Sequence, residues 1–348
     1  MNIVNTKKAD EIGSEFWDSF SVSDKKFFLT GRTALEYIIR DILNEKQIKS
    51  VLLPSYCCRT MIKPFVKHGI KVRFYDVFFD NNTGLSVSLP PPQKDEILYL
   101  IRYFGYSTVS GLDYERIRRD YCTIIEDTTH SWLNNTVIDS DYCFTSYKKW
   151  TGVSGIALAE KKKGLFFADR LQKNEEFIRL RNEAFSLKRK YIETGEGDKT
   201  VFLRLFEAAE DLIEDDYCNY EPDYNALEQL LSLNVEAMKS IRRSNAKCLI
   251  RELESMDELQ LMFHDMAASD VPLFVPVLLS NQRDEIRRFL INRDIYLPVH
   301  WPISEYHLGL SEQAHDLYKN ELSIVCDQRY GLNDMKRIVN TIKEFYCN

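Results

Sequence analysis

An acid and a pair of lysines follow two successive apolar runs in the middle of this sequence. Asp127 ends the run that begins at Ile124, and Lys148 and Lys149 end the next run, residues 141–147. An aspartate after one strand and a lysine after the next can hold pyridoxal phosphate (PLP). The lysine forms a Schiff base with its aldehyde, and the carboxylate keeps the pyridine nitrogen protonated. Asp and Lys are also common as solvated side chains at strand ends, so the surrounding pattern must decide.

That pattern alternates short apolar runs with segments of helical periodicity. Helices are predicted over residues 33–44, 61–68 and 112–120, and strands over 51–54, 72–77, 97–102 and 122–126. Strands and helices in this order predict a parallel sheet with crossover helices. Ligands collect at the carboxyl ends of such strands, where Pro54, Tyr103, Asp127 and Lys149 fall.

The second half of the chain has a different pattern. Residues 155–168 are expected to form a hairpin with Lys161, Lys162 and Lys163 at its solvated tip. The further expectations are a helical region over 172–218 broken at 195–197, a long helix over 224–255, a strand over 271–279, and helices over 284–292 and 334–345. Together they predict a large domain over 1–235, with an N-terminal segment over 1–24, and a small α+β domain over 236–348.

Composition is that of a soluble globular protein. The 348 residues are 44% hydrophobic and 28% charged, and a net charge of −7 argues against nonspecific nucleic-acid binding. No apolar stretch reaches the roughly 18 residues of a membrane span, and the N-terminus lacks a signal-peptide core. The eight cysteines show no CxxC spacing, so we expect no metal site, no disulfide framework and a cytoplasmic protein.

Beyond these patterns, the chain resembles the DegT/StrS-type sugar aminotransferases, which belong to the fold-type I PLP-dependent enzymes. The segments that carry the resemblance are 30–35, 53–56, 69–76, 124–130, 145–150, 242–245 and 297–302. The resemblance implies an α/β fold in which a large domain has a mostly parallel sheet between helices. A smaller α+β domain would follow at the C-terminus.

Roles for individual residues follow from the resemblance. Lys149 would form the Schiff base and later move the substrate proton; the spacing from Ser146 favours it over Lys148. Such a lysine needs a lowered pKa. Asp127 would pair with the pyridine nitrogen. His130 would lie near the cofactor's 3′-oxygen, although a histidine at a helix start is the simpler interpretation of that residue alone.

The cofactor phosphate is expected at the start of the 33–44 helix. Backbone N–H groups of Arg32 and Thr33 and the Thr33 hydroxyl can bind an anion there, helped by the helix dipole. Gly31 would allow a close backbone approach, and Ser146 would add a second hydroxyl. The alternative is an ordinary helix cap.

One position departs from the family pattern. Cys58 stands where an aromatic side chain usually covers the cofactor ring, so Tyr56 is expected to stack there instead, or Thr129 to hold the ring through weaker contacts. The glycine-rich run after the lysine is reduced to Gly152 and Gly155.

The function implied by the resemblance is transamination of a keto sugar carried on a nucleotide, with glutamate as amino donor, by a homodimer without nucleic-acid or membrane partners. One alternative is a catalytically weak or regulatory homologue. Another is a PLP-dependent sugar dehydratase, although those enzymes replace the lysine with histidine. A nucleotide-binding dehydrogenase is disfavoured, because no GxGxxG motif follows a predicted strand.

Overall fold

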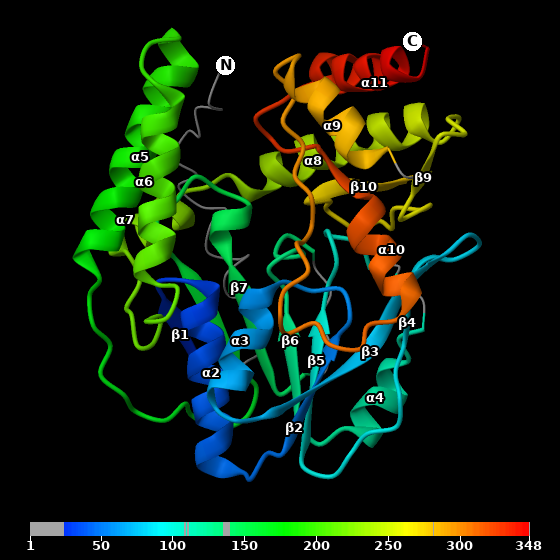
Figure 1. The fold of residues 1–348 in the computed structure, drawn as a ribbon. Helices are drawn as coiled ribbons and strands as arrows, with labels where there is room; N and C mark the ends of the chain where they lie inside the picture. The colour runs from blue at the N-terminus through cyan, green and yellow to red at the C-terminus, as the bar shows by residue number, and fades with distance from the viewer. Residues whose placement is uncertain (1–23, 108, 110, 135–139, 281, 348) are drawn as a thin grey trace. The chain divides into compact units, whose positions relative to one another are not determined.

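The structure is a computed structural model that describes residues 24–107, 109, 111–134, 140–280 and 282–347 (Figure 1). Two compact units are formed from alternating segments of the chain. The first unit takes in the described residues of Met1–Gln47 and Asp141–Asn234, and the second those of Ile48–Ser140 and Val235–Asn348. The expected division into 1–235 and 236–348 stays a prediction. No helix among the described residues is long and apolar enough to cross a membrane.

The larger sheet has eight strands in the order β1-β8-β7-β6-β5-β2-β3-β4. Those of the first unit are antiparallel: β1 (Asp24–Phe28), β8 (Ala157–Lys161) and β7 (Tyr142–Ser146). Those of the second unit are β6 (Ile124–Asp127), β5 (Glu96–Ile101), β2 (Ser50–Pro54), β3 (Lys71–Asp80) and β4 (Gly84–Ser88). The neighbours from β6 to β3 are parallel, and only β4 runs the other way. Strands β2 and β5 are buried along their whole length, as the apolar runs of a parallel sheet require.

The helices of the first unit are α2 (Gly31–Glu45), α5 (Glu175–Thr194), α6 (Lys199–Leu212) and α7 (Tyr224–Leu231). Helices α5 and α6 lie side by side (Figure 1). Their apolar faces meet in a core that includes Phe177, Leu180 and Ala209. Helix α5 ends because Gly195 takes a left-handed conformation, with φ of 72°.

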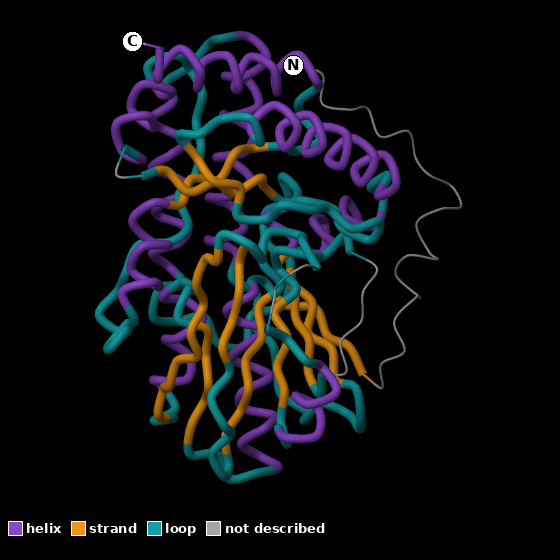
Figure 2. The backbone as a smooth tube through the Cα atoms, turned by 90° about the vertical axis from the view of Figure 1, so that its right-hand side faces the viewer, coloured by secondary structure: helices purple, strands orange, loops and turns teal. Residues whose placement is uncertain are grey.

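The second unit contains a three-stranded antiparallel sheet as well as its share of the larger one (Figure 2). The small sheet consists of β11 (Glu321–Val325), β10 (Phe274–Leu279) and β9 (Leu259–Leu261). The helices of this unit are α3 (Arg59–Lys67), α4 (Tyr114–Asp120), α8 (Val235–Leu253), α9 (Arg283–Ile291), α10 (Glu312–Asn320) and α11 (Leu332–Cys347). Side chains of α8, α9 and α11 share one apolar core with the small sheet.

The predicted helices and strands before residue 155 are confirmed within a few residues. The predicted hairpin over 155–168 is wrong, because β8 pairs with β7 and β1 instead. The N–H groups of Phe166 and Phe167 donate to the carboxylates of Asp24 and Asp41, so these residues need no partner strand. Lys161 is not a solvated tip residue either. It is buried, and its ammonium lies 2.6 Å from the Asp41 carboxylate.

The long helix predicted over 224–255 is also wrong, because residues 232–234 separate α7 from α8. The N–H of Leu233 turns back to the carbonyl of Leu230, which ends α7 without a glycine or a proline. The break predicted at 195–197 and the helices predicted over 284–292 and 334–345 are confirmed. The strand predicted over 271–279 begins only at Phe274.

Candidate active site

The start of α2 lies against the end of β7 in the first unit. Thr30 caps the helix: its hydroxyl oxygen accepts from the Thr33 N–H at 3.2 Å and lies 3.0 Å from the Thr33 hydroxyl. A Cβ atom on Gly31 would come within 2.9 Å of the Ser146 Cβ, which is closer than real Cβ contacts allow. Only glycine therefore lets the helix start approach the strand end this closely. The structure brings the predicted phosphate residues Gly31 and Ser146 close together, and Thr33 lies in the first turn of the same helix.

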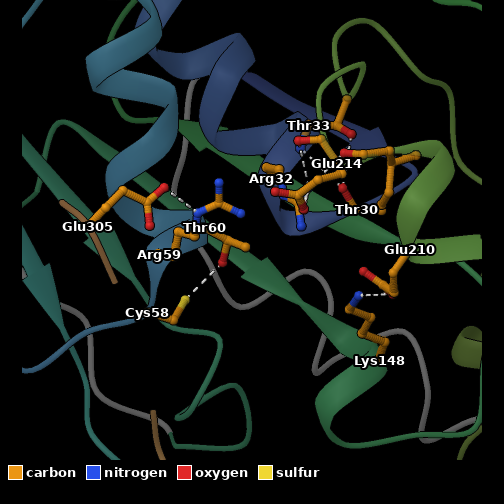
Figure 3. Close-up of polar contacts among 11 residues, drawn as sticks. Thr30, Arg32, Thr33, Cys58, Arg59, Thr60, Lys148, Glu210, Glu214 and Glu305 are labelled. Atoms are coloured by element: carbon orange, nitrogen blue, oxygen red, sulfur yellow. Dashed lines mark hydrogen bonds and ion pairs between the residues drawn. The ribbon is translucent and has the colours of Figure 1, made fainter. Parts of the chain in front are cut away.

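Arg32, the fourth predicted phosphate residue, sends its side chain elsewhere. Its Nη1 donates to the carbonyl of Ile213 at 2.6 Å and lies 3.3 Å from the Glu214 carboxylate (Figure 3). The guanidinium also stands over the Tyr217 ring, 5.4 Å from its centroid. Arg32 can thus serve an anion at the helix start through its backbone N–H, since the first turn leaves such groups without intrahelical acceptors.

The two adjacent lysines have different environments in the short turn that follows β7. Lys148 points to α6, where its Nζ lies 2.7 Å from the Glu210 carboxylate (Figure 3). Glu210 also lies 3.2 Å from Arg181 of α5. Burial lowers the pKa of Lys148, and the nearby positive charges of Arg181 and Lys149 act in the same direction, while Glu210 opposes them. Lys149 is exposed. Its amine is therefore the more accessible of the two.

Asp127 ends β6 in the second unit, with 2% of its surface exposed. Its carboxylate accepts hydrogen bonds from the Tyr99 hydroxyl at 2.9 Å and from the Thr129 N–H at 2.8 Å. Burial and the charge of Asp127 raise the pKa of Tyr99, so that hydroxyl stays protonated and donates. A buried carboxylate held in this way is oriented before any ligand arrives.

The neighbouring acid, Glu126, is separated from Asp127 by the alternation of side chains along a strand. Its carboxylate lies 2.6 Å from Arg102 and 3.4 Å from the Ser140 hydroxyl. Burial raises the pKa of Glu126. The alternation thus assigns Glu126 to a buried ion pair with Arg102 and Asp127 to the Tyr99 side.

His130 lies three residues beyond Asp127 within a group of aromatic rings. The Trp301 ring stacks on it at a centroid distance of 5.4 Å and an interplanar angle of 27°. The rings of Phe104 and His300 lie 5.2 and 5.6 Å away. His300 and Trp301 belong to the segment 297–302 that carries part of the family resemblance, but neither was predicted as a site residue. Their signal was a histidine beside a tryptophan in a short loop.

Tyr56 is fully buried in the second unit. Its hydroxyl donates to the carbonyl of His300, and its ring lies 5.2 Å from the Trp301 ring. Burial raises the pKa of Tyr56, and the negative charge of Glu321 adds to the effect. Cys58, at the N-cap of α3, directs its sulfur to the Thr60 hydroxyl at 2.8 Å (Figure 3). The stacking role of Tyr56 stays a prediction.

Two residues that contact predicted site residues were not predicted from the sequence: Tyr99, which donates to Asp127, and Glu210, which pairs with Lys148. Tyr99 lies in a predicted strand, and its one signal was a polar hydroxyl inside an apolar run. Glu210 lies 62 residues from Lys148 and has no local signal at all.

No family model matches the chain, and no curated protein sequence does. DesV from S. venezuelae, solved with a ketimine intermediate, is similar over 95% of this chain and 87% of its own, at 15% identity and a TM-score of 0.65. Spr1654 from Streptococcus pneumoniae, solved in a PLP-form, matches over 93% and 87%, at 14% identity and a TM-score of 0.62.

A third similar structure is a DegT DnrJ EryC1 StrS aminotransferase from Brucella abortus. It matches over 95% of this chain and 88% of its own, at 15% identity and a TM-score of 0.61. Likeness at such low identity bears on the fold alone. The α/β fold expected from the sequence is confirmed, and the chain has the fold of the sugar aminotransferases to which it is similar.

Proposed function

We propose that this protein is a PLP-dependent aminotransferase that transfers an amino group to the keto group of a sugar. The observation that carries the proposal is the buried Asp127 carboxylate, oriented by Tyr99 and Thr129 at the end of a parallel strand. A buried acid of this kind can keep a pyridine nitrogen protonated. Spr1654, which has a similar fold, was solved in a PLP-form.

The residues at the start of α2 fit a phosphate group. The close approach of Gly31 to Ser146 leaves no room for a side chain, and a helix N-terminus with adjacent hydroxyls attracts an anion. We assign the phosphate to the backbone N–H of Arg32 and to the hydroxyls of Thr33 and Ser146. The Thr33 N–H is taken by Thr30 and is not needed.

When bound, PLP supplies an electron sink that stabilises negative charge on the substrate carbon. The chain's own residues would control the protons around it. Asp127 would keep the pyridine nitrogen protonated, and the Lys149 amine would bind the cofactor aldehyde and then carry the substrate proton. His130 would orient the cofactor at its 3′-oxygen, and Tyr56 would cover the ring.

The finer proposal is a nucleotide-linked deoxy sugar as acceptor and glutamate as donor, within amino-sugar synthesis for surface polysaccharides or glycosides. The similar structures that are described as sugar aminotransferases, Spr1654 among them, support the acceptor class. We further propose a homodimer, as the resemblance to the fold-type I enzymes implies. A cytoplasmic location is supported by the eight cysteines, none of which forms a disulfide in the structure.

The absorbance spectrum of the purified protein tests this function. After incubation with PLP, a band near the visible range is expected, and glutamate should convert it to the shorter-wavelength band of the pyridoxamine form. A band that glutamate and other amino acids leave unchanged would favour the catalytically weak or regulatory homologue. Absence of any PLP band would remove the proposal altogether.

A further inference from the structure

A buried carboxylate holds the loop that carries His300 and Trp301 in the second unit. Glu321 begins β11 with none of its surface exposed. One carboxylate oxygen accepts from the backbone N–H of His300 at 2.6 Å, and the other accepts from the Ser323 hydroxyl at 2.5 Å. Tyr56 donates to the His300 carbonyl, so both polar groups of this backbone residue are bound.

The same contacts determine the tautomer of the His300 ring. Its Nδ1 lies 2.9 Å from the Ser323 oxygen. An ionised carboxylate only accepts hydrogen bonds, so the Ser323 hydroxyl gives its proton to Glu321. The Ser323 oxygen must then accept from the ring, and Nδ1 of His300 carries the proton. In a neutral ring, Nε2 is left as the acceptor.

The ring fixed in this way packs against a residue of the proposed site. His300 meets His130 edge to face, with ring centroids 5.6 Å apart and an interplanar angle of 79°. The next residue, Trp301, stacks on the same His130 ring, and Phe104 contacts both histidines. His130 itself is 2% exposed, so these rings form part of the packing that surrounds it.

The burial of the Glu321 carboxylate must be offset by some benefit to the structure. Taking a carboxylate out of water is unfavourable, and an apolar residue at the same place avoids that cost. Buried polar networks rigidify and specify one arrangement when every member is satisfied. Here each Glu321 oxygen has a donor, and the arrangement specified is that of His300 and Trp301 around His130.

We propose that Glu321 and Ser323 act as positioning residues: they lock His300 as its Nδ1–H tautomer and thereby hold His130 in place. The consequence for catalysis rests on the proposed function, in which His130 orients the cofactor. The lock itself is a property of this chain and can be measured without cofactor.

Nuclear magnetic resonance of the full chain with 15N-labelled histidine rings tests the lock directly. The His300 and His130 signals are assigned by their loss in His300→Gln and His130→Gln. We expect wild-type His300 to show a protonated Nδ1 and an unprotonated Nε2. In Ser323→Ala the His300 signals should shift and the His130 signals should move with them, whereas Ser323→Thr, which keeps a hydroxyl, should retain the wild-type pattern.

A matched control comes from the same unit. Ser50 is buried and donates to the Glu96 carboxylate at 2.9 Å, so Ser50→Ala removes a serine–glutamate bond that leads to no histidine. It should leave the His130 and His300 signals unchanged. If Ser323→Ala does not fold, Glu321→Gln replaces it, since the amide keeps the shape but cannot accept at both positions.

Two results would overturn the proposal: an Nε2–H tautomer of wild-type His300, or His130 signals that stay in place in a folded Ser323→Ala or Glu321→Gln variant. If the protein binds PLP, the first half-reaction with glutamate should slow roughly tenfold in Ser323→Ala, the kind of loss that a misplaced group produces. If it binds no PLP, the proposed function fails while the ring signals still decide the lock.

Discussion

At the scale of single residues, two adjacent lysines have different surroundings. The Lys148 ammonium is paired with Glu210, while Lys149 is exposed. The lowered pKa of Lys148 is a property expected of a Schiff-base lysine. We nevertheless assign that role to Lys149, because the Lys148 amine is held by Glu210 and must leave that partner before it can attack an aldehyde.

Asp127→Asn tests the role of the carboxylate. The amide is nearly the same size but cannot keep a pyridine nitrogen protonated. The variant should therefore still bind PLP, but its half-reaction with glutamate should be slower by a factor of roughly 100 or more. Stopped-flow absorbance measures the rate. Tyr99→Phe is the matched variant, because it removes the 2.9 Å hydrogen bond to Asp127 and keeps the charge of the Asp127 carboxylate. Its half-reaction should be slowed far less than that of Asp127→Asn. Near wild-type turnover in Asp127→Asn would make the acid a purely structural residue.

At the scale of elements, the approach of α2 to β7 depends on the absence of one side chain. Gly31→Ala places a methyl group against Ser146 and should lower the free energy of unfolding by about 1–3 kcal/mol, as overpacking does. Denaturant unfolding measures it. Ser146→Gly in the same chain removes the opposing Cβ and should restore part of the loss. Gly331→Ala, where no atom lies within 4 Å of the added Cβ, should be close to neutral. Additive effects of Gly31→Ala and Ser146→Gly would show that the two residues do not meet.

The sequence predicts helices and strands correctly where a segment has a strong hydrophobic periodicity of its own. The strands β2, β5 and β6 and the helix α2 follow from apolar runs and helical spacing. The mistakes occurred where distant residues decide. Lys161 looks solvated in a run of three lysines, but Asp41, 120 residues away, draws it into the interior. Strand β1, which the sequence analysis did not predict, is a strand through its pairing with β8.

The candidate site also contains residues that the sequence could identify and residues whose surroundings it could not predict. Asp127, Ser146 and the helix start at Gly31 could be found from their positions at the ends of elements. The environments of Lys148 and His130 could not, because Glu210 and Trp301 reach them from remote segments. Sequence spacing carries no information on such contacts until the fold is known.

At the scale of the whole molecule, we expect a homodimer in solution, measured by light scattering. Helix α6 exposes half of Leu203, and we place the contact with the second chain in the helical region over 172–255. Leu203→Lys should therefore shift the dimer toward monomer. Leu308→Lys, at an exposed apolar residue of the second unit, should leave it unchanged. A wild-type monomer with full activity would contradict the dimer, and equal effects of both variants would contradict the location.

The central claim, that the chain holds PLP through Lys149, is tested most directly by reduction with borohydride followed by mass spectrometry. The reduction converts a Schiff base into a stable pyridoxyl adduct, and peptide mapping identifies the modified residue. We expect one adduct, on Lys149, which is lost in Lys149→Ala and kept in Lys148→Ala. An adduct on Lys148, or none on either lysine in protein incubated with PLP, would contradict it.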